Sequence, residues 1–189
     1  MKFLSAVAAK LLRDLGFKQA GWNISHASGA WDAKQRSQDL VALVERLAAG
    51  GRVVEFGCGN GEVVGYLPYG AFSSYLGTDV SSVAVKTCAE THKRANVSFE
   101  VADMASWPGE NGGVQLILCE ECIYYLTPDQ VESFLNICMS SLTDTGRVLL
   151  TLHSKTKFAG LIAQIRAGWN VVEDKDQGER VYLVLGKPA

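Results

Sequence analysis

Residues 119–126, with the sequence CEECIYYL, contain two cysteines in the C-x-x-C arrangement that metal sites and redox dithiols share. A zinc site would need further ligands, but the chain has no second C-x-x-C motif and no histidine pair with H-x3-5-H spacing. A lone C-x-x-C is also a weak signal for redox chemistry. We therefore expect no metal, no disulfide framework, and small, buried, free thiols. The cysteines are Cys58, Cys88, Cys119, Cys122 and Cys138.

A second candidate site is the glycine-rich stretch EFGCGNGE, residues 55–62. Its G-x-G-x-G spacing is typical of a sharp turn whose backbone comes close to a ligand, because a Cβ would block both. Glu62 stands where a dinucleotide fingerprint requires Gly or Ala, which disfavours NAD. Asp79 follows about twenty residues later, at a spacing where a carboxylate can accept hydrogen bonds from two ribose hydroxyls. A third acid, Asp103, ends the next apolar run.

The elements that must position these residues follow from the hydrophobic pattern. Apolar runs alternate with helical segments from residue 50 onward, which predicts βαβ units and a mostly parallel sheet with helices on both faces. The final two runs flank a turn-rich segment, residues 175–178, and predict an antiparallel hairpin. Ligands bind at the carboxyl ends of such strands, so the glycine turn and the acids should share one edge. The runs are RVVEF, SYLGTDV, VSFEVAD, VQLILCE, RVLLTLH, GWNVVED and ERVYLVLG.

The helices carry their own start and stop signals. Thr127 and Gln130 form a predicted capping box, with Pro128 at the first helical position. The apolar stripe that follows contains Val131, Phe134, Leu135, Cys138 and Leu142. At the N-terminus, apolar residues at helical spacing end at Gly16 and predict an amphipathic helix.

The order of these motifs resembles the class I S-adenosylmethionine-dependent methyltransferases. VVEFGCGNG is similar to their first motif, and Asp79 and Asp103 match their successive strand-end acids. The resemblance runs from about residue 51 to the C-terminus. It implies an α/β, Rossmann-like, seven-stranded, mostly parallel sheet with helices on both faces, an antiparallel last strand, and S-adenosyl-L-methionine as cofactor. CEECIYYL then looks like the fourth motif, and its YYL is similar to nodulation-type N-methyltransferases and related small-molecule enzymes.

The resemblance also implies roles for single positions. Gly57 and Gly59 would lie against the methionine part of the cofactor, and Asp79 would hold the ribose. Asp103 and Met104 would meet the adenine. The other positions implied in cofactor binding are Glu55, Cys58, Val80, Cys119 and Glu120.

Methyl transfer requires alignment of donor and acceptor, exclusion of water and, for a protonated acceptor, removal of a proton. His153 ends the fifth predicted strand on the same edge as the glycine turn, and an imidazole side chain suits a general base. A structural histidine is the alternative. Glu121 and Tyr124 are the next candidates, whereas Tyr125 is expected in the core. His92 is expected on a solvated helix end.

We expect a single domain over residues 1–189, with residues 1–50 as a helical lid and 51–189 as the cofactor-binding core. Asp32 and Gln35 form a second predicted capping box in the lid. Arg36 would clamp the cofactor carboxylate with Trp31 stacked nearby; the alternative is a surface arginine and a core tryptophan. His26, in the Ser/Gly-rich entry segment, can also reach the site, and Trp22 is interpreted as packing.

Composition excludes several function classes. The chain has 48% hydrophobic and 20% charged residues, as in an ordinary globular domain, and a net charge of -2. The net charge provides no global positive field to attract nucleic acid, and a local basic patch is the alternative. The Asn/Asp-Pro-Pro-Tyr motif of base methyltransferases is absent, so we expect no nucleic-acid partner. No apolar run is long enough to span a membrane, and we expect a cytoplasmic protein without membrane contact. The pattern does not indicate an oligomeric state.

Three function hypotheses follow. The leading one is methylation of a small-molecule acceptor at nitrogen or oxygen. The second is methylation of RNA or protein, which would require a basic rim around the site. The third is a catalytically silent subunit that binds the cofactor or a partner; the intact glycines and acids argue against it.

Overall fold

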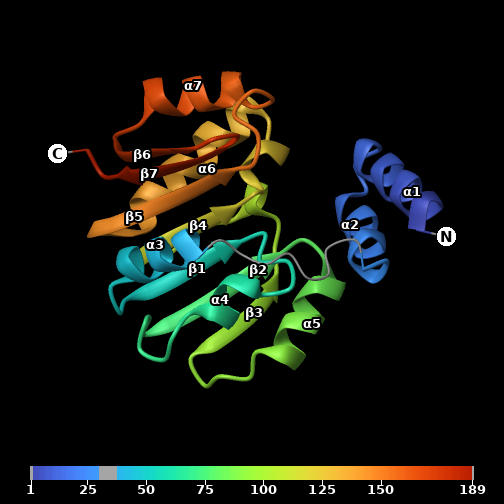
Figure 1. The fold of residues 1–189 in the computed structure, drawn as a ribbon, viewed down its shortest axis with the longest axis horizontal. Coiled ribbons are helices and arrows are strands. Elements are labelled where there is room, and N and C mark those ends of the chain that lie inside the picture. The colour runs from blue at the N-terminus through green and yellow to red at the C-terminus, as the bar shows by residue number, and fades with distance from the viewer. Residues whose placement is uncertain (1, 30–37, 189) are drawn as a thin grey trace.

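A seven-stranded sheet in the order β3-β2-β1-β4-β5-β7-β6 forms the centre of the molecule (Figure 1). This computed structural model describes residues 2–29 and 38–188. Strands β1 to β5 run parallel, while β7 is antiparallel to both β5 and β6, which confirms the predicted architecture. The strands are β1 Arg52–Phe56, β2 Ser74–Asp79, β3 Val97–Val101, β4 Val114–Glu120, β5 Leu142–Leu152, β6 Val171–Gln177 and β7 Arg180–Gly186.

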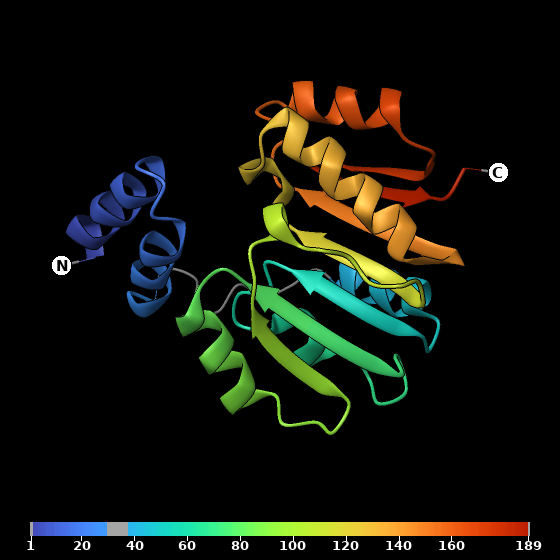
Figure 2. The same ribbon diagram turned by 180° about the vertical axis from the view of Figure 1, so that it is seen from behind.

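Helices cover the two faces of this sheet. Helices α3 and α4 pack on one face, and α6 and α7 pack on the other, as the reverse view shows (Figure 2). Because both faces are covered, the central strand β4 is apolar and almost continuously buried. Helix α5 packs against β2 and β3. The bounds are α3 Gln38–Ala48, α4 Glu62–Tyr66, α5 Ser82–Thr91, α6 Pro128–Ser141 and α7 Ala159–Gly168.

The start of α6 is as predicted. The backbone N–H of Gln130 donates to Thr127 Oγ1 (3.3 Å), and the backbone N–H of Thr127 donates to Gln130 Oε1 (3.0 Å), which completes the capping box. The predicted stripe of α6 is buried. Strand β5 begins at Leu142, earlier than the predicted Arg147, because the chain passes from α6 into the strand without a loop. Strand β6 extends to Gln177 and shortens the predicted turn.

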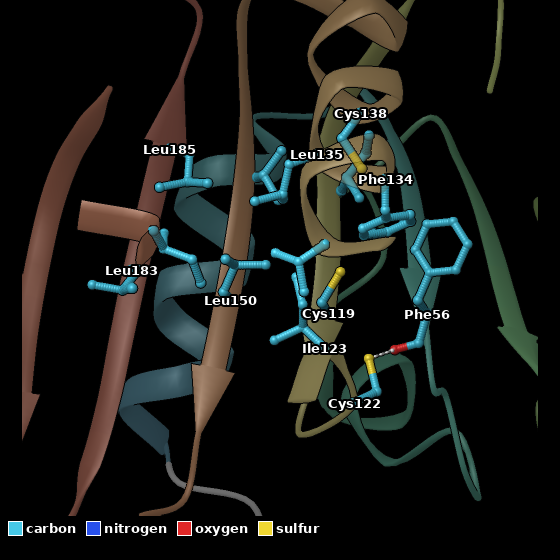
Figure 3. Packing of buried hydrophobic residues seen from close by; sticks show 14 of the residues in the cluster. Phe56, Cys119, Cys122, Ile123, Phe134, Leu135, Cys138, Leu150, Leu183 and Leu185 are labelled. Atoms are coloured by element: carbon cyan, nitrogen blue, oxygen red, sulfur yellow. Dashed lines mark hydrogen bonds between the residues drawn. The ribbon is translucent and has the colours of Figure 1, made fainter. Parts of the chain in front are cut away.

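The cysteines of the C-x-x-C motif lie in the core between β4 and α6 (Figure 3). Burial raises the pKa of both Cys119 and Cys122, so these thiols stay protonated. The Cys122 thiol donates a hydrogen bond to the carbonyl oxygen of Phe56 (3.2 Å). All five cysteines are free and buried. These contacts support the interpretation of the motif as packing.

Two N-terminal helices, α1 (Lys2–Asp14) and α2 (Lys18–Ala27), form a hairpin at one side of the sheet, beside the N-terminal end of α5 (Figure 1). They cross closely at Gly21, where a Cβ would lie 2.6 Å from the carbonyl oxygen of Ala9. The guanidinium of Arg13 donates to Ser25 Oγ (2.9 Å) and lies 4.5 Å from the centre of the Trp22 ring. Helices α1 and α2 are therefore held to each other by their own side-chain contacts. Helix α3 also falls in the range predicted as lid, but its apolar residues belong to the core.

Candidate active site at the carboxyl edge of the sheet

The glycine turn, residues 57–61, leaves β1 with Gly57, Gly59 and Gly61 in the left-handed region of φ. A Cβ at Gly57 would lie 2.8 Å from the Cβ of Cys122, so the turn is packed against the C-x-x-C segment at this point. A Cβ at Gly59 would meet its nearest atoms only at 3.9 Å. The turn is thus closed on its inner side at Gly57 and accessible to a ligand at Gly59.

Asp79, at the end of β2, is bound to the glycine turn. Its Oδ2 accepts a hydrogen bond from the backbone N–H of Gly59 (3.1 Å), and its Oδ1 accepts one from Ser81 (2.8 Å). The residue is 8% exposed. A carboxylate offers about four lone-pair sites, so two remain for the hydroxyls of a ligand. The role of Asp79 in holding a ribose stays a prediction.

Asp103 lies at the end of the neighbouring strand, as predicted, and begins the 3-10 turn Met104–Ser106 by accepting from the backbone N–H of Ala105 (3.0 Å). Its other oxygen forms an ion pair with Lys18 of α2 (3.1 Å). Met104 is partly buried against the core. The ion pair with Lys18 joins residues 85 apart in sequence, and no motif predicts it.

A second contact brings α2 over this edge. Asn23 Oδ1 accepts from the Ser81 hydroxyl (2.8 Å), and its Nδ2 donates to the Ser82 hydroxyl (3.2 Å). His26, predicted in an entry loop, lies in α2 instead, with its Cε1 3.9 Å from where a Cβ of Gly59 would stand. Helix α2 therefore lies across the ends of β2 and β3 and beside the glycine turn.

The remaining predicted cofactor positions differ in access. Glu55 is buried beneath the turn, where it accepts a short hydrogen bond from the Tyr75 hydroxyl (2.6 Å). Burial and the Glu55 carboxylate raise the pKa of Tyr75, so the phenol stays protonated and Glu55 keeps its donor. Other predicted cofactor positions are Cys58, Cys119 and Glu120, which are buried, and Val80, which is half-buried. Trp31, Arg36 and the capping box of Asp32 and Gln35 lie outside the described residues.

The predicted catalytic candidates Glu121 and His153 form a pair. Glu121 Oε2 accepts hydrogen bonds from both Nδ1 and the backbone N–H of His153, each at 2.8 Å. Its Oε1 accepts from the Thr151 hydroxyl (3.4 Å) and faces Nε of Arg180 (3.7 Å). Glu121 has a φ of 53°, which is uncommon for a non-glycine residue and typical of functional sites.

Two aromatic rings, those of Tyr124 and Phe158, lie beside His153. Tyr124 stacks on Phe158 with centroids 4.2 Å apart and planes 9° apart, and His153 meets both rings edge-on at 5.3 and 5.2 Å. Burial raises the pKa of Tyr124 well above its usual range, so it can donate a hydrogen bond but is not a base. We call Glu121, Tyr124, His153, Phe158 and Arg180 the β4–β5 cluster.

The pair defines the tautomer of His153. Because a carboxylate only accepts hydrogen bonds, Nδ1 carries the proton in neutral imidazole and Nε2 has the free lone pair. Within residues 2–29 and 38–188, Nε2 makes no hydrogen bond, and the side chain is 44% exposed. Leu152 packs in the core, as predicted, and leaves His153 on the accessible side. The arrangement suits a general base that a carboxylate orients.

Two sequence-based expectations are wrong in this region. Tyr125 is 47% exposed rather than in the core, and its ring meets Trp22 of α2 edge-on at 5.1 Å. His92 is half-buried rather than solvated. Its ring occupies the space that Gly61 and Gly65 leave, and its Nε2 donates to the carbonyl oxygen of Asn60 (3.2 Å).

Sequence reasoning missed Phe158 and Arg180. The antiparallel ladder of β5 and β7 ends with Leu152 opposite Val181, which puts Arg180 beside His153. The position of Arg180 follows only from the pairing of β5 with β7. The predicted hairpin would have indicated it if the exact register of that pairing had been known.

The described part of the chain contains no group of three or more His, Cys, Asp or Glu side chains arranged to hold a metal ion. Over the same residues, no helix combines the length and the apolar character needed to cross a membrane.

Residues 53–146 match the family model described as a methyltransferase domain. Among curated proteins, a highly reducing polyketide synthase from Fusarium sp. is 26% identical over 166 residues, which is 81% of this chain. The chain spans only 6% of the length of that relative.

Solved structures share the fold. The N-methyltransferase NodS from Bradyrhizobium japonicum WM9, in complex with S-adenosyl-L-homocysteine, has a TM-score of 0.67 at 16% identity, covering 84% of this chain and 90% of its own. A TehB-like SAM-dependent methyltransferase from Corynebacterium glutamicum has a TM-score of 0.59 at 20% identity, covering 80% and 94%. A Haloferax volcanii chain from a complex of the Trm112 methyltransferase activator with a methyltransferase has a TM-score of 0.63 at 16% identity, covering 98% of each.

Proposed function

Because the chain is a class I S-adenosylmethionine-dependent methyltransferase, we propose that it methylates a small-molecule acceptor at nitrogen or oxygen. The observation that carries this proposal is the Glu121–His153 pair, which presents a free imidazole nitrogen on the same sheet edge as the glycine turn. Such a pair can remove a proton from a small nucleophile, and the Tyr124 and Phe158 rings put apolar surface beside it.

The residues at the glycine turn fit the cofactor. The side of Gly59 without close neighbours would hold the methionine part, the remaining lone pairs of Asp79 would accept the ribose hydroxyls, and Asp103 with Met104 would lie against the adenine. When bound, S-adenosylmethionine supplies an electrophilic methyl group on a sulfonium sulfur. The protein's tasks are then to align the acceptor, to exclude water and to take up the acceptor's proton.

Water exclusion is the role we propose for the α1–α2 hairpin. Helix α2 lies over the ends of β2 and β3 through Lys18 and Asn23, and it meets the C-terminal side of the C-x-x-C segment through Trp22 and Tyr125. A lid in this place covers both the cofactor and the acceptor sides. This proposal narrows the lid from residues 1–50 to the first two helices.

RNA and protein acceptors remain the alternative class. They would need a basic rim, and the net charge of -2 does not favour one. Free, buried thiols fit a reducing compartment, which supports our proposal of a cytoplasmic location.

The test is incubation with S-adenosylmethionine labelled on its methyl group and three acceptor sets: a panel of amines, phenols, sugars and carboxylates, total RNA, and whole-cell protein. We expect label in one or more small molecules, and loss of it in His153→Ala. Label confined to RNA or protein would contradict the small-molecule proposal. Arg166→Ala is the matched control, because its guanidinium pairs with Asp174 on the far edge of the sheet.

A further inference from the structure

The α1–α2 hairpin lies apart from the helices that cover the two faces of the sheet (Figure 1). Within the described residues, the two apolar core clusters on those faces contain no residue of α1 or α2. Ala9 and Gly21 are buried where the two helices of the hairpin cross each other. Trp22 contacts the half-exposed ring of Tyr125. Because elements with few buried apolar contacts open at low free-energy cost, the hairpin is suited to move as a unit.

The first contact that docks α2 is the ion pair between Nζ of Lys18 and Oδ2 of Asp103 (3.1 Å). Asp103 is the acid that we expect beside the adenine, and its Oδ1 accepts from the backbone N–H of Ala105. The side chains of Lys18 and Asp103 are 42% and 35% exposed, so water and salt screen their attraction. The contact at the adenine end is therefore weak and depends on salt.

The second docking contact is made by Asn23 and is better shielded from water. Its Oδ1 accepts from the hydroxyl of Ser81 (2.8 Å), a residue that is completely buried. The backbone N–H of Ser81 donates to Asp79 (2.8 Å), which also accepts from the backbone N–H of Gly59 (3.1 Å). A continuous series of hydrogen bonds thus joins α2 to the expected ribose position and to the glycine turn. Because Asn23 and Ser81 are neutral, salt should affect their contact little.

These two contacts place α2 along the expected cofactor site. His26, three residues after Asn23, brings its Cε1 to 3.9 Å from the position that a Cβ of Gly59 would occupy. That is the side of Gly59 without closer neighbours, where we expect the methionine part. Lys18, at the other end of α2, lies at Asp103. Helix α2 therefore extends from the methionine end to the adenine end of the site.

We propose that Lys18 and Asn23 are positioning residues that form a polar latch, and that the cofactor is exchanged only when both of their contacts break. This proposal rests on the proposed function and adds a regulatory step to it, because lid opening then limits both the entry and the departure of the cofactor. Both contacts join protein groups to each other, so neither needs the cofactor in order to form. Removal of either contact therefore raises the population of the open lid before binding as well as after it.

The test is a stopped-flow measurement of the association and dissociation rate constants of S-adenosylhomocysteine. Lys18→Ala should raise both constants by about threefold, the scale for an exposed ion pair. Asn23→Ala should raise both by about tenfold, the scale for a shielded hydrogen bond. The dissociation constant, which is the ratio of the two rate constants, should stay nearly unchanged.

Lys10→Ala is the matched control, because Lys10 forms an ion pair with Asp14 inside α1. Both rate constants should stay unchanged in this variant. Added salt should raise both constants in the unmodified protein and in Asn23→Ala, but not in Lys18→Ala. A rise in the dissociation rate alone would overturn the latch, because it would show that the substituted residue binds the cofactor directly. Unchanged rates in Lys18→Ala and Asn23→Ala would overturn it as well.

A distance measurement tests the latch without the cofactor. Spin labels are attached at Leu11→Cys on α1 and Tyr69→Cys in the core domain, since both positions are exposed and all native thiols are buried. We expect a longer and broader distance distribution when Lys18→Ala and Asn23→Ala are combined, and no change with Lys10→Ala. An unchanged distribution in the combined variant would overturn the latch. Absence of S-adenosylhomocysteine binding would instead refute the proposed function, and the distances would still decide whether these residues hold the hairpin.

Discussion

The glycine turn and the β4–β5 cluster lie on the same edge of the sheet but are built differently. The turn is held by backbone groups: Gly59 donates to Asp79, and Cys58 donates to the carbonyl oxygen of Thr78 (3.0 Å). The cluster is held by side chains, above all the contacts of Glu121 with His153. Changes in the turn should therefore affect folding and cofactor binding, whereas changes in the cluster should affect chemistry alone.

The largest expected effect is on turnover in the cluster. His153→Ala should lower turnover by about 10²- to 10⁴-fold, the range for loss of a general base. Affinity for S-adenosylhomocysteine should stay near that of the unmodified protein, because His153 contacts no residue of the glycine turn among the described contacts. The measurement is steady-state kinetics with calorimetry on the same sample.

The pH dependence of that variant sharpens the result. The deficit should shrink as pH rises, because the acceptor then loses its proton without help from a base. Turnover equal to that of the unmodified protein would eliminate His153 as the general base. Lost cofactor affinity would show that the β4–β5 cluster and the glycine turn do not act independently.

The next effect is on folding at the turn. Gly57→Ala should reduce the free energy of unfolding by about 2 to 4 kcal/mol, since an alanine there adopts left-handed backbone and its Cβ meets Cys122. Gly59→Ala, with similar φ but no close neighbour, should cost about 1 kcal/mol and serves as the control. Urea denaturation of both gives the comparison. An equal loss of unfolding free energy in the two variants would show that the packing of Gly57 against Cys122 is not tight.

A smaller effect is expected at the ribose position. Asp79→Ala should weaken S-adenosylhomocysteine binding by about 1 to 3 kcal/mol through lost charged hydrogen bonds. Because Asp79 also binds Gly59 and Ser81, unfolding is measured alongside calorimetry. Unchanged affinity in a folded variant would mean that the ribose is held elsewhere.

The smallest effect lies far from both regions. Arg46 binds Glu173 through two short contacts (2.7 and 2.8 Å) and lowers the pKa of that carboxyl. A lowered folded-state pKa gives stability that is present above the unfolded pKa and lost as pH falls through the folded one. The pair is solvent-exposed, so Arg46→Ala should cost about 0.5 kcal/mol at neutral pH. The difference should vanish in acid; a constant difference across pH would contradict an ionic origin.

Most of the fold was predictable because the information is local. Alternating apolar runs gave the strands, and the capping box at Thr127 gave the start of α6. The glycine turn was equally local, because its conformation depends on residues that are contiguous in sequence. The start of β5 was placed too late, since no loop residues separate it from α6.

The β4–β5 cluster was predictable only as separate residues. His153 and Glu121 are 32 residues apart, and their pairing depends on the register of β4 with β5. The ring contact of Tyr125 with Trp22 joins residues that are more distant still in sequence. Such contacts arise from tertiary structure, which single-sequence patterns do not encode.

The most direct test of the central claim is calorimetric titration of the purified chain with S-adenosylhomocysteine and, separately, with NAD. The G-x-G-x-G turn with Glu62 after it, and Asp79 bound to Gly59, predict saturable heat for S-adenosylhomocysteine and none for NAD. Heat for NAD with none for S-adenosylhomocysteine would contradict the assignment of the glycine turn to a methyltransferase cofactor.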